Sequence, residues 1–213
     1  MPSLAGVLGG ALTAEKPPAR ARLFIALDLP EEPRRALAAW RDRALADCQD
    51  LRPVPLDALH ITLVFLGNRL EQEVETVVEH GLRAEVADLP APVLVPTEVV
   101  PIPRRRPRLF ALDLADGDGG AQAVHAAVSR ALTAASLYEP ERRPFWPHLT
   151  LARVRGTRRR SPPGRDVPAL RAAPPPAAPL ICDRVTLYRS HLSPHGARYE
   201  PLARTRLRTA MAD

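Results

Sequence analysis

The chain has 213 residues, of which 46% are apolar, and a formal net charge of +6. This length and apolar content allow a buried core and exclude a disordered protein, and no apolar run reaches the roughly 18 residues of a membrane-spanning helix. Two distant cysteines, Cys48 and Cys182, exclude a disulfide-rich secreted domain and predict reduced thiols in a cytoplasmic protein. The surplus of positive charge suggests a polyanionic partner such as RNA.

The first part of the chain predicts a leader, a strand and a helix. Residues 1–20 contain a mildly apolar stretch broken by two glycines and preceded by no basic residue, so we expect a flexible leader rather than a signal peptide. A run of strand formers follows at 22–29. The segment 30–33, with two prolines and two glutamates, suits the first turn of a helix that extends to about Ala44.

The middle of the chain predicts a further helix between strands. Residues 71–87 place four apolar side chains on one helical stripe, which predicts a helix with a buried face. Clustered valines predict a strand over 91–101, where prolines then bend the chain, and a second apolar run predicts a strand over 108–114.

The last part of the chain completes the α+β class. Residues 120–137 carry apolar side chains at i, i+3, i+4, i+7 and i+8 and predict a third helix. The segment 155–179, rich in proline and arginine, predicts a loop, and strand character returns at 181–190 and 198–207. We therefore expect one α+β domain over 21–207, with a short tail at 208–213.

Two segments of the chain repeat one pattern. Residues 22–29 read Arg-Leu-Phe-Ile-Ala-Leu-Asp-Leu, and residues 108–114 read Arg-Leu-Phe-Ala-Leu-Asp-Leu. From the arginine of each copy to the next His-x-Thr sequence the distance is 38 residues in the first copy and 40 in the second. Each copy reads strand, helix, strand, so an internal duplication into two similar lobes is predicted.

The most informative pattern is a pair of His-x-Thr-apolar tetrapeptides, at residues 60–63 and 148–151, each on the second strand of one copy. Residues i and i+2 of a strand share a face, so each histidine shares a face with its threonine. On the first of these strands Ile61, Leu63 and Phe65 are expected to point the other way, into the core. If the lobes pack about a pseudo-twofold axis, both His–Thr faces line one groove.

Two imidazoles and two hydroxyls suit acid–base chemistry at phosphorus. Hydrolysis of a cyclic phosphodiester needs one proton taken from water and another given to the departing oxygen, and histidine can do either near neutral pH. His60 and His148 are therefore the candidate catalytic residues. Thr62 and Thr150 are candidate donors to the phosphoryl oxygens, where negative charge builds up. The residues alone leave open which histidine is the acid.

A metal site is the competing interpretation of a histidine pair. It needs further ligands, and no Asp, Glu or Cys stands beside either histidine at ligand spacing, so we expect neither a metal nor another cofactor. Of the other histidines, His80 and His125 are expected at the surface of helices. His191 and His195, on either side of a proline in a turn, could approach the groove.

The candidate substrate-binding residues are Arg153 and Phe24. Arg153 could neutralise a phosphate, but strict alternation aims it away from His148 unless the strand bulges or ends. Four aromatic residues could stack on a base: Phe24, Phe65, Phe145 and Trp146. Core packing is the default interpretation for Phe24 and Phe65. Two arginine runs, 104–106 and 158–160, could attract RNA, but a solvated charge run is the simpler interpretation of both.

The chain resembles bacterial RNA 2′,3′-cyclic phosphodiesterases of the 2H phosphoesterase superfamily, historically called the 2′-5′ RNA ligase family. The resemblance covers about residues 20–207 and is carried by 22–27, 59–67, 146–153, 187–190 and 196–199. It implies a bilobal fold of two pseudo-symmetric lobes of antiparallel sheet, with outer helices and a central groove.

The same resemblance implies an activity and the role of each motif residue. The activity is hydrolysis of RNA 2′,3′-cyclic phosphate ends to 2′-phosphates without a metal. The proton donor of the family falls on His60 and its proton acceptor on His148, with Thr62 and Thr150 holding the phosphate.

Two alternatives stay open at this point. The same four residues would serve a hydrolase or ligase of 2′-5′ phosphodiesters or small cyclic nucleotides. From another class, the chain could be a non-catalytic RNA-binding module with a relict groove, although its intact motifs count against this. The expected partner is RNA or an oligonucleotide ending in a 2′,3′-cyclic phosphate, bound by a cytoplasmic monomer that does not engage a membrane.

Overall fold

The structure is a computed structural model that describes residues 18–155, 173–193 and 196–209. Residues 1–17 of the expected leader, most of the loop predicted at 155–179 with its arginine run, and His195 lie outside the described residues. The first strand begins at Arg20, and Arg208 of the expected tail forms a bridge with Pro90.

The described residues form one mixed-length antiparallel sheet in the order β7-β4-β5-β6-β3-β1-β8-β9, with β2 paired to β6. The strands are β1 Arg20–Asp28, β2 Leu51–Pro53, β3 His60–Leu70, β4 Val93–Ile102, β5 Leu109–Ala115, β6 His148–Val154, β7 Leu180–Ile181, β8 Arg184–Ser193 and β9 Gly196–Arg206.

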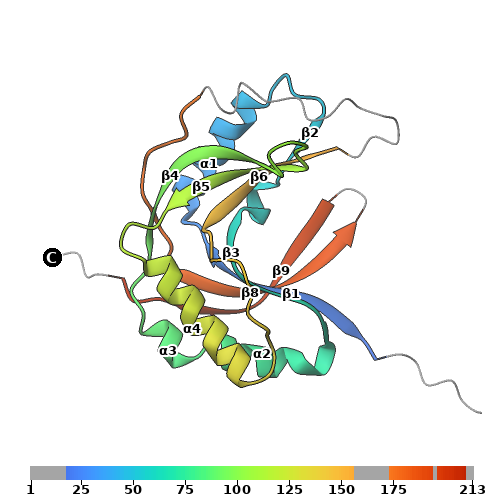
Figure 1. The fold of residues 1–213 in the computed structure, drawn as a ribbon, viewed down its shortest axis with the longest axis vertical. Coiled ribbons are helices and arrows are strands. Elements are labelled where there is room, and N and C mark those ends of the chain that lie inside the picture. Colours follow the sequence, from blue (N-terminus) through green and yellow to red (C-terminus); the bar gives the residue numbers. More distant parts are fainter. Residues whose placement is uncertain (1–17, 156–172, 194–195, 210–213) are drawn as a thin grey trace, which may run out of the picture.

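The sheet divides into two lobes that meet at β3 and β6. Figure 1 shows β4, β5 and β6 as one wing and β3, β1, β8 and β9 as the other. The two wings are joined by the pairing of Ile61 with Leu149. Each copy of the duplicated segment pairs with its histidine strand: β1 with β3, and β5 with β6. The α+β bilobal fold predicted from the sequence is thus confirmed, and the two repeated segments occupy equivalent places in it.

The helices cover the face of the sheet that turns away from the histidines. They are α1 Glu31–Ala44, α2 Val74–Gly81, α3 Ala84–Ala87 and α4 Gly120–Ala134, with short 3-10 turns at Leu56–Ala58 and Glu71–Glu73. Although α4 follows β5, it packs against α2, α3 and β3 of the other lobe. On the far side, Arg41 of α1 donates a hydrogen bond to the carbonyl oxygen of Val54, next to β2. Each long helix therefore ties its own lobe to the other one (Figure 1).

The single helix predicted over 71–87 is wrong in one respect, because the segment forms a 3-10 turn, α2 and α3 in succession. The turn begins where the Glu73 carboxylate accepts a hydrogen bond from the Leu70 amide. The break falls after Gly81, where a Cβ would lie 2.6 Å from the Cδ1 atom of Ile25. A glycine allows α2 to approach β1 closely, and glycine also weakens helix continuation.

Candidate catalytic site

The two His-x-Thr sequences lie side by side on one face of the sheet. Ile61 and Leu149 are cross-strand partners and are fully buried, so their side chains point into the core. By strand alternation, His60 and Thr62 on β3 and their counterparts on β6 point to the opposite face. Diagonal neighbours in an antiparallel ladder lie about 7–8 Å apart, so the two histidines are close enough to flank one small group. The two His-x-Thr sequences therefore share one face of the sheet at the junction of the lobes.

Both imidazoles are fixed by the same hydrogen bond. The Nδ1 atom of His60 lies 2.8 Å from the carbonyl oxygen of Ala58, and that of His148 lies 2.8 Å from the carbonyl oxygen of Trp146. A carbonyl oxygen only accepts, so each Nδ1 carries the hydrogen. In the neutral rings Nε2 is then the basic nitrogen, and in His60 it accepts a hydrogen bond from the Thr62 hydroxyl at 3.1 Å. The backbone carbonyl two residues before each histidine therefore selects the tautomer with the hydrogen on Nδ1.

His60 stands in an aromatic surround that disfavours its charged form. Phe24 lies 4.8 Å from it between ring centroids, and Tyr199 meets it edge-on at 5.1 Å. Burial lowers the pKa of His60 to about 4, against the raising effects of the Ala58 carbonyl and of Asp28; His148 and Arg153 lower it further. His60 is therefore neutral at pH 7 before a ligand binds.

His148 packs against a different aromatic residue, Trp146. The indole ring of Trp146 lies nearly parallel to the imidazole, with centroids 4.3 Å apart and an interplanar angle of 16°. The polar edge of this ring is held as well, because Asp113 Oδ1 accepts the hydrogen bond of Trp146 Nε1. Trp146 was a candidate for base stacking in the sequence, and its described contact is with the histidine.

A bulge at the same place in each lobe changes the direction of later side chains. Between β1 and β3 the register skips Leu63, and between β5 and β6 it skips Leu151. One extra residue reverses the alternation, so the fifth residue after each histidine returns to the histidine face. Those residues are Phe65 and Arg153. The sequence placed Arg153 on the histidine face only if the strand bulged, and the strand does bulge. Arg153 is exposed and lowers the pKa of His60.

The same bulge makes the sequence prediction for Phe65 wrong. Strict alternation put its ring in the core, whereas it is 41% exposed, and the Arg22 guanidinium lies 4.6 Å from its centroid. Phe24, the candidate substrate-binding aromatic, is only 4% exposed and packs between His60 and two tyrosines, Tyr188 and Tyr199. Of the two phenylalanines, Phe65 is therefore the one whose ring a ligand can reach.

The remaining sequence candidates lie elsewhere. His80 and His125 lie on helices α2 and α4 and are partly exposed, and His125 stacks on Phe145 with centroids 4.4 Å apart. His191 binds Glu200 at 2.7 Å on the β8–β9 hairpin. The arginines at 104–106 are exposed, as a solvated run would be.

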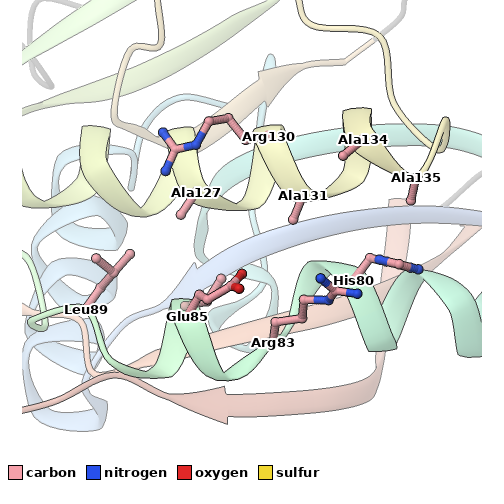
Figure 2. A pocket seen from close by; sticks show the side chains of 10 residues that line it. His80, Arg83, Glu85, Leu89, Ala127, Arg130, Ala131, Ala134 and Ala135 are labelled. Carbon is pink, nitrogen blue, oxygen red and sulfur yellow. The ribbon is translucent and has the colours of Figure 1, made fainter.

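A depression in the molecular surface lies outside the groove, between α4 and the α2–α3 pair. Figure 2 shows the alanines of α4 facing His80, Arg83 and Glu85 across it. It contains neither His-x-Thr sequence, and its titratable lining residues, His80 and Glu85 among them, are not the paired histidines that the sequence predicts for the site.

Three residues of the site were missed in the sequence: Asp28, Asp113 and Tyr188. Asp28 Oδ1 accepts a hydrogen bond from the Tyr188 hydroxyl at 2.7 Å, and Asp28 Oδ2 accepts one from Thr186 at 2.9 Å. Burial, followed by the charge of Asp28, raises the pKa of Tyr188. The repeated aspartate of the duplicated segments was the available signal, since a polar residue recurs at the end of an otherwise apolar strand.

The described residues contain neither a membrane-spanning helix nor a metal-binding cluster. None of their helices has the length and apolar character needed to cross a membrane. Within the same residues no three His, Cys, Asp or Glu side chains are grouped as a metal site would need.

Comparison with known proteins identifies relatives over most of the chain. A family model described as the 2′-5′ RNA ligase superfamily matches residues 29–194. The RNA 2′,3′-cyclic phosphodiesterase of Thermus thermophilus is 35% identical over 194 residues, which cover 88% of this chain and 90% of the relative. The RNA 2′,3′-cyclic phosphodiesterase of Escherichia coli K12 is 31% identical over 195 residues, covering 86% and 94%. The crystal structure of E. coli LigT with 3′-AMP has a TM-score of 0.65 at 26% identity and covers 89% of this chain and 99% of that one.

Proposed function

Because this chain belongs to the 2′-5′ RNA ligase superfamily, we propose that it hydrolyses RNA 2′,3′-cyclic phosphodiester ends to 2′-phosphomonoesters by two-histidine acid–base catalysis. The observation that carries the proposal is the pair of imidazoles on one face, each with its Nδ1 bound to the carbonyl two residues before it. That arrangement makes Nε2 of both rings the nitrogen that can exchange a proton with a group between them; in the free protein, Nε2 of His60 accepts the hydrogen bond of the Thr62 hydroxyl.

In this mechanism the protons balance across the phosphorus. His148 Nε2 takes a proton from the attacking water while the bond from that oxygen to phosphorus forms. The bond from phosphorus to the 3′ oxygen breaks, and His60 Nε2 gives that oxygen its proton, so the 2′-phosphomonoester remains. Thr62 and Thr150 donate to the nonbridging oxygens. Each proton transfer contributes roughly 10² to 10⁴ in rate.

The negative charge of the substrate also affects the protonation of His60, which must carry a proton to act as the donor. Its pKa of about 4 in the free protein leaves it neutral at pH 7. A phosphodiester anion beside the ring favours the imidazolium and raises the pKa. Substrate binding and proton uptake by His60 are therefore coupled, and the free protein holds the donor without its proton until the anion arrives.

Two side chains of the histidine face suit the rest of the substrate. Arg153 can neutralise the phosphate, and a guanidinium presents paired donors to its oxygens. Phe65 offers an exposed ring on which a base can stack. Phe24, by contrast, supports His60 from below and has little surface to offer a ligand. E. coli LigT was crystallised with 3′-AMP, which has the same two parts, a base and a phosphate on the ribose.

The test is product analysis on an RNA oligonucleotide that ends in a 2′,3′-cyclic phosphate, with EDTA present. We expect a 2′-phosphate end by ³¹P NMR, and a loss of at least about 10²-fold in kcat for both His60→Ala and His148→Ala. His191→Ala is the matched control, since His191 lies on the hairpin and binds Glu200. Binding without turnover would leave an RNA-binding module in place of an enzyme, and cleavage of 2′-5′-linked dinucleotides in preference would identify the other hydrolase.

The proposal extends to where the protein acts. Its two cysteines are not paired with each other, as is usual for cytoplasmic proteins, and we place it in the cytoplasm as a monomer. Cell fractionation and sedimentation equilibrium test the compartment and the monomer separately.

A further inference from the structure

Each motif histidine has an aspartate as its direct cross-strand partner. Asp28 pairs with His60 between β1 and β3, and Asp113 pairs with His148 between β5 and β6. Directly opposed residues of antiparallel strands share a face, so both carboxylates lie on the face that carries the imidazoles. They are the repeated aspartates of the duplicated segments, and the mechanism above gives them no role.

Asp113 reaches His148 through Trp146. Its Oδ1 accepts the indole N–H of that tryptophan, and its Oδ2 accepts a hydrogen bond from the Thr97 hydroxyl at 2.5 Å. The indole ring lies against the imidazole at 4.3 Å, and the carbonyl of the same tryptophan accepts the Nδ1 hydrogen of His148. A tryptophan held by its N–H therefore fixes the imidazole at two points, its face and its Nδ1.

Asp28 stands in the same relation to His60 through a tyrosine. Its carboxylate accepts hydrogen bonds from the Tyr188 and Thr186 hydroxyls. Tyr188 stacks on Phe24 with centroids 5.2 Å apart and an angle of 17°, and Phe24 in turn lies against His60. In each lobe, then, the aspartate binds one threonine hydroxyl and the polar tip of one aromatic ring. That ring supports the histidine directly in the case of Trp146 and through Phe24 in the case of Tyr188.

We propose that Asp28 and Asp113 are positioning residues, each of which fixes the aromatic wall of its histidine and places a negative charge beside it. The inference rests on the proposed function, because it needs both histidines to transfer protons. The two carboxylates act through other groups, since the Nδ1 of each imidazole is already bound to a backbone carbonyl.

The charge of Asp28 gives its half a measurable signature. Asp28 favours the imidazolium of His60, whereas His148 and Arg153 oppose it. The titratable or charged groups that face His60 are Asp28 from β1, His148 and Arg153 from β6, Tyr188 from β8 and Tyr199 from β9. Removing the Asp28 charge leaves a donor that loses its proton at lower pH. A purely structural aspartate would not move this titration.

The experiment compares Asp28→Asn and Asp113→Asn with the matched control Asp116→Asn. Asp116 is also a carboxylate near this strand end, but it binds the Ala121 and Gln122 amides at the start of α4. We expect both test variants to lose about tenfold or more in kcat with little change in KM, because misplaced catalytic groups cost rate. Asp28→Asn should also shift the alkaline limb of the kcat profile, which reports the enzyme–substrate complex, to lower pH. The control should lose thermal stability alone.

A double-mutant cycle tests the path from Asp113 to His148. Trp146→Phe keeps a ring beside the imidazole and removes the N–H that Asp113 binds. If the aspartate acts through that bond, Trp146→Phe reproduces the loss, and adding Asp113→Asn to it costs nothing further. Fully additive losses, or two aspartate variants whose kcat and pH profile match those of Asp116→Asn, would overturn the inference.

Side-chain ¹⁵N spectra separate this inference from the proposed function. We expect the Nδ1–H signal of His148 to broaden in Asp113→Asn and that of His60 to do so in Asp28→Asn. Sharp, unchanged Nδ1–H signals in both variants would overturn the inference even for an active enzyme. A wild-type protein that leaves cyclic phosphates intact would instead refute the proposed function.

Discussion

His60 and His148 occupy equivalent positions in the two lobes but stand in different surroundings. His60 is enclosed by Phe24, Tyr188 and Tyr199, with the Thr62 hydroxyl on its Nε2. His148 has one tryptophan against its face. Duplication thus provides two similar imidazoles, and the residues around them make the two unequal. Acid and base roles at one phosphorus require that inequality.

At Phe65 we expect a change in substrate binding. Phe65→Leu should raise KM for nucleoside 2′,3′-cyclic phosphates about tenfold and leave kcat nearly unchanged, because stacking on a base is worth roughly 1–3 kcal/mol and lies away from the bonds that change. Steady-state kinetics measure both constants. Phe65→Tyr, which keeps a ring, is the control. A fall in kcat without a rise in KM would show that the ring is not a base platform.

At Arg153 the expected effects are on rate and on titration. Arg153→Gln should lower kcat/KM about 10²-fold by removing a guanidinium from the phosphate, an effect of about 3 kcal/mol. The same change removes a positive charge that lowers the pKa of His60, so in the free protein the pKa of His60 should rise above about 4. An NMR titration of the imidazole checks the second effect, and an unchanged midpoint would contradict the placement of Arg153 beside His60.

Among the helices, α4 has an N-terminus held by a side chain before it. Both oxygens of Asp116 accept backbone amides of the first turn, from Ala121 at 3.1 Å and Gln122 at 2.9 Å. Asp116→Ala leaves those amides without this partner and should cost about 1 kcal/mol of the free energy of unfolding, or about 2–4 °C in Tm. Thermal melting measures the loss. Catalysis should be unaffected, and a fall in kcat would contradict a purely capping role.

Periodicity in the sequence predicted the strands and the long helices because each buries one face. The strand expected at 22–29 and the helix expected at 120–137 correspond to β1 and α4 within a few residues. The short strand β2 was not predicted, since three residues show no period, and its pairing with β6 depends on contacts distant in the sequence.

The candidate site was predictable as far as the two motifs reach. His60 and His148 share a groove face as expected, because alternation holds over the first residues of each strand. Phe65 was misplaced because a bulge depends on how the neighbouring strand pairs, and one sequence does not reveal that pairing. The roles of Asp28 and Asp113 were missed for the same reason, since their partners lie on β8, on β4 and in the segment before β6.

For the whole molecule, the site lies where the two lobes are joined by a single residue pair between strands β3 and β6. The lobes share the β3–β6 contact at Ile61 and Leu149, and the long helices cross from one lobe to the other on the opposite face. The buried face therefore holds the lobes together, which leaves the histidine face free to be a groove. Polar groups between the two lobes of the sheet cost stability, and the packed helices on the other face compensate for them.

We expect the free energy of unfolding to fall at acid pH, because burial disfavours the charged form of His60 in the folded protein. His60 has a pKa of about 4 in the folded protein and near 6.5 in an unfolded chain. Between these values the unfolded state binds the proton and the folded state does not, so stability is complete above pH 6.5 and falls as the pH drops to about 4. The loss is at most about 3 kcal/mol, and less to the extent that water reaches the ring.

His60→Gln removes this titration while keeping a side chain of similar reach. Denaturant unfolding of both proteins at several pH values measures the difference, and the carboxylates that titrate in the same range cancel because both proteins contain them. We expect the wild-type protein to lose stability relative to the variant as the pH falls from 6.5 to 4. Above pH 7 the difference between their free energies of unfolding should be constant. A difference that stays constant throughout would mean that His60 is as well solvated in the folded protein as in the unfolded chain, and the protonation coupled to substrate binding would lose its basis.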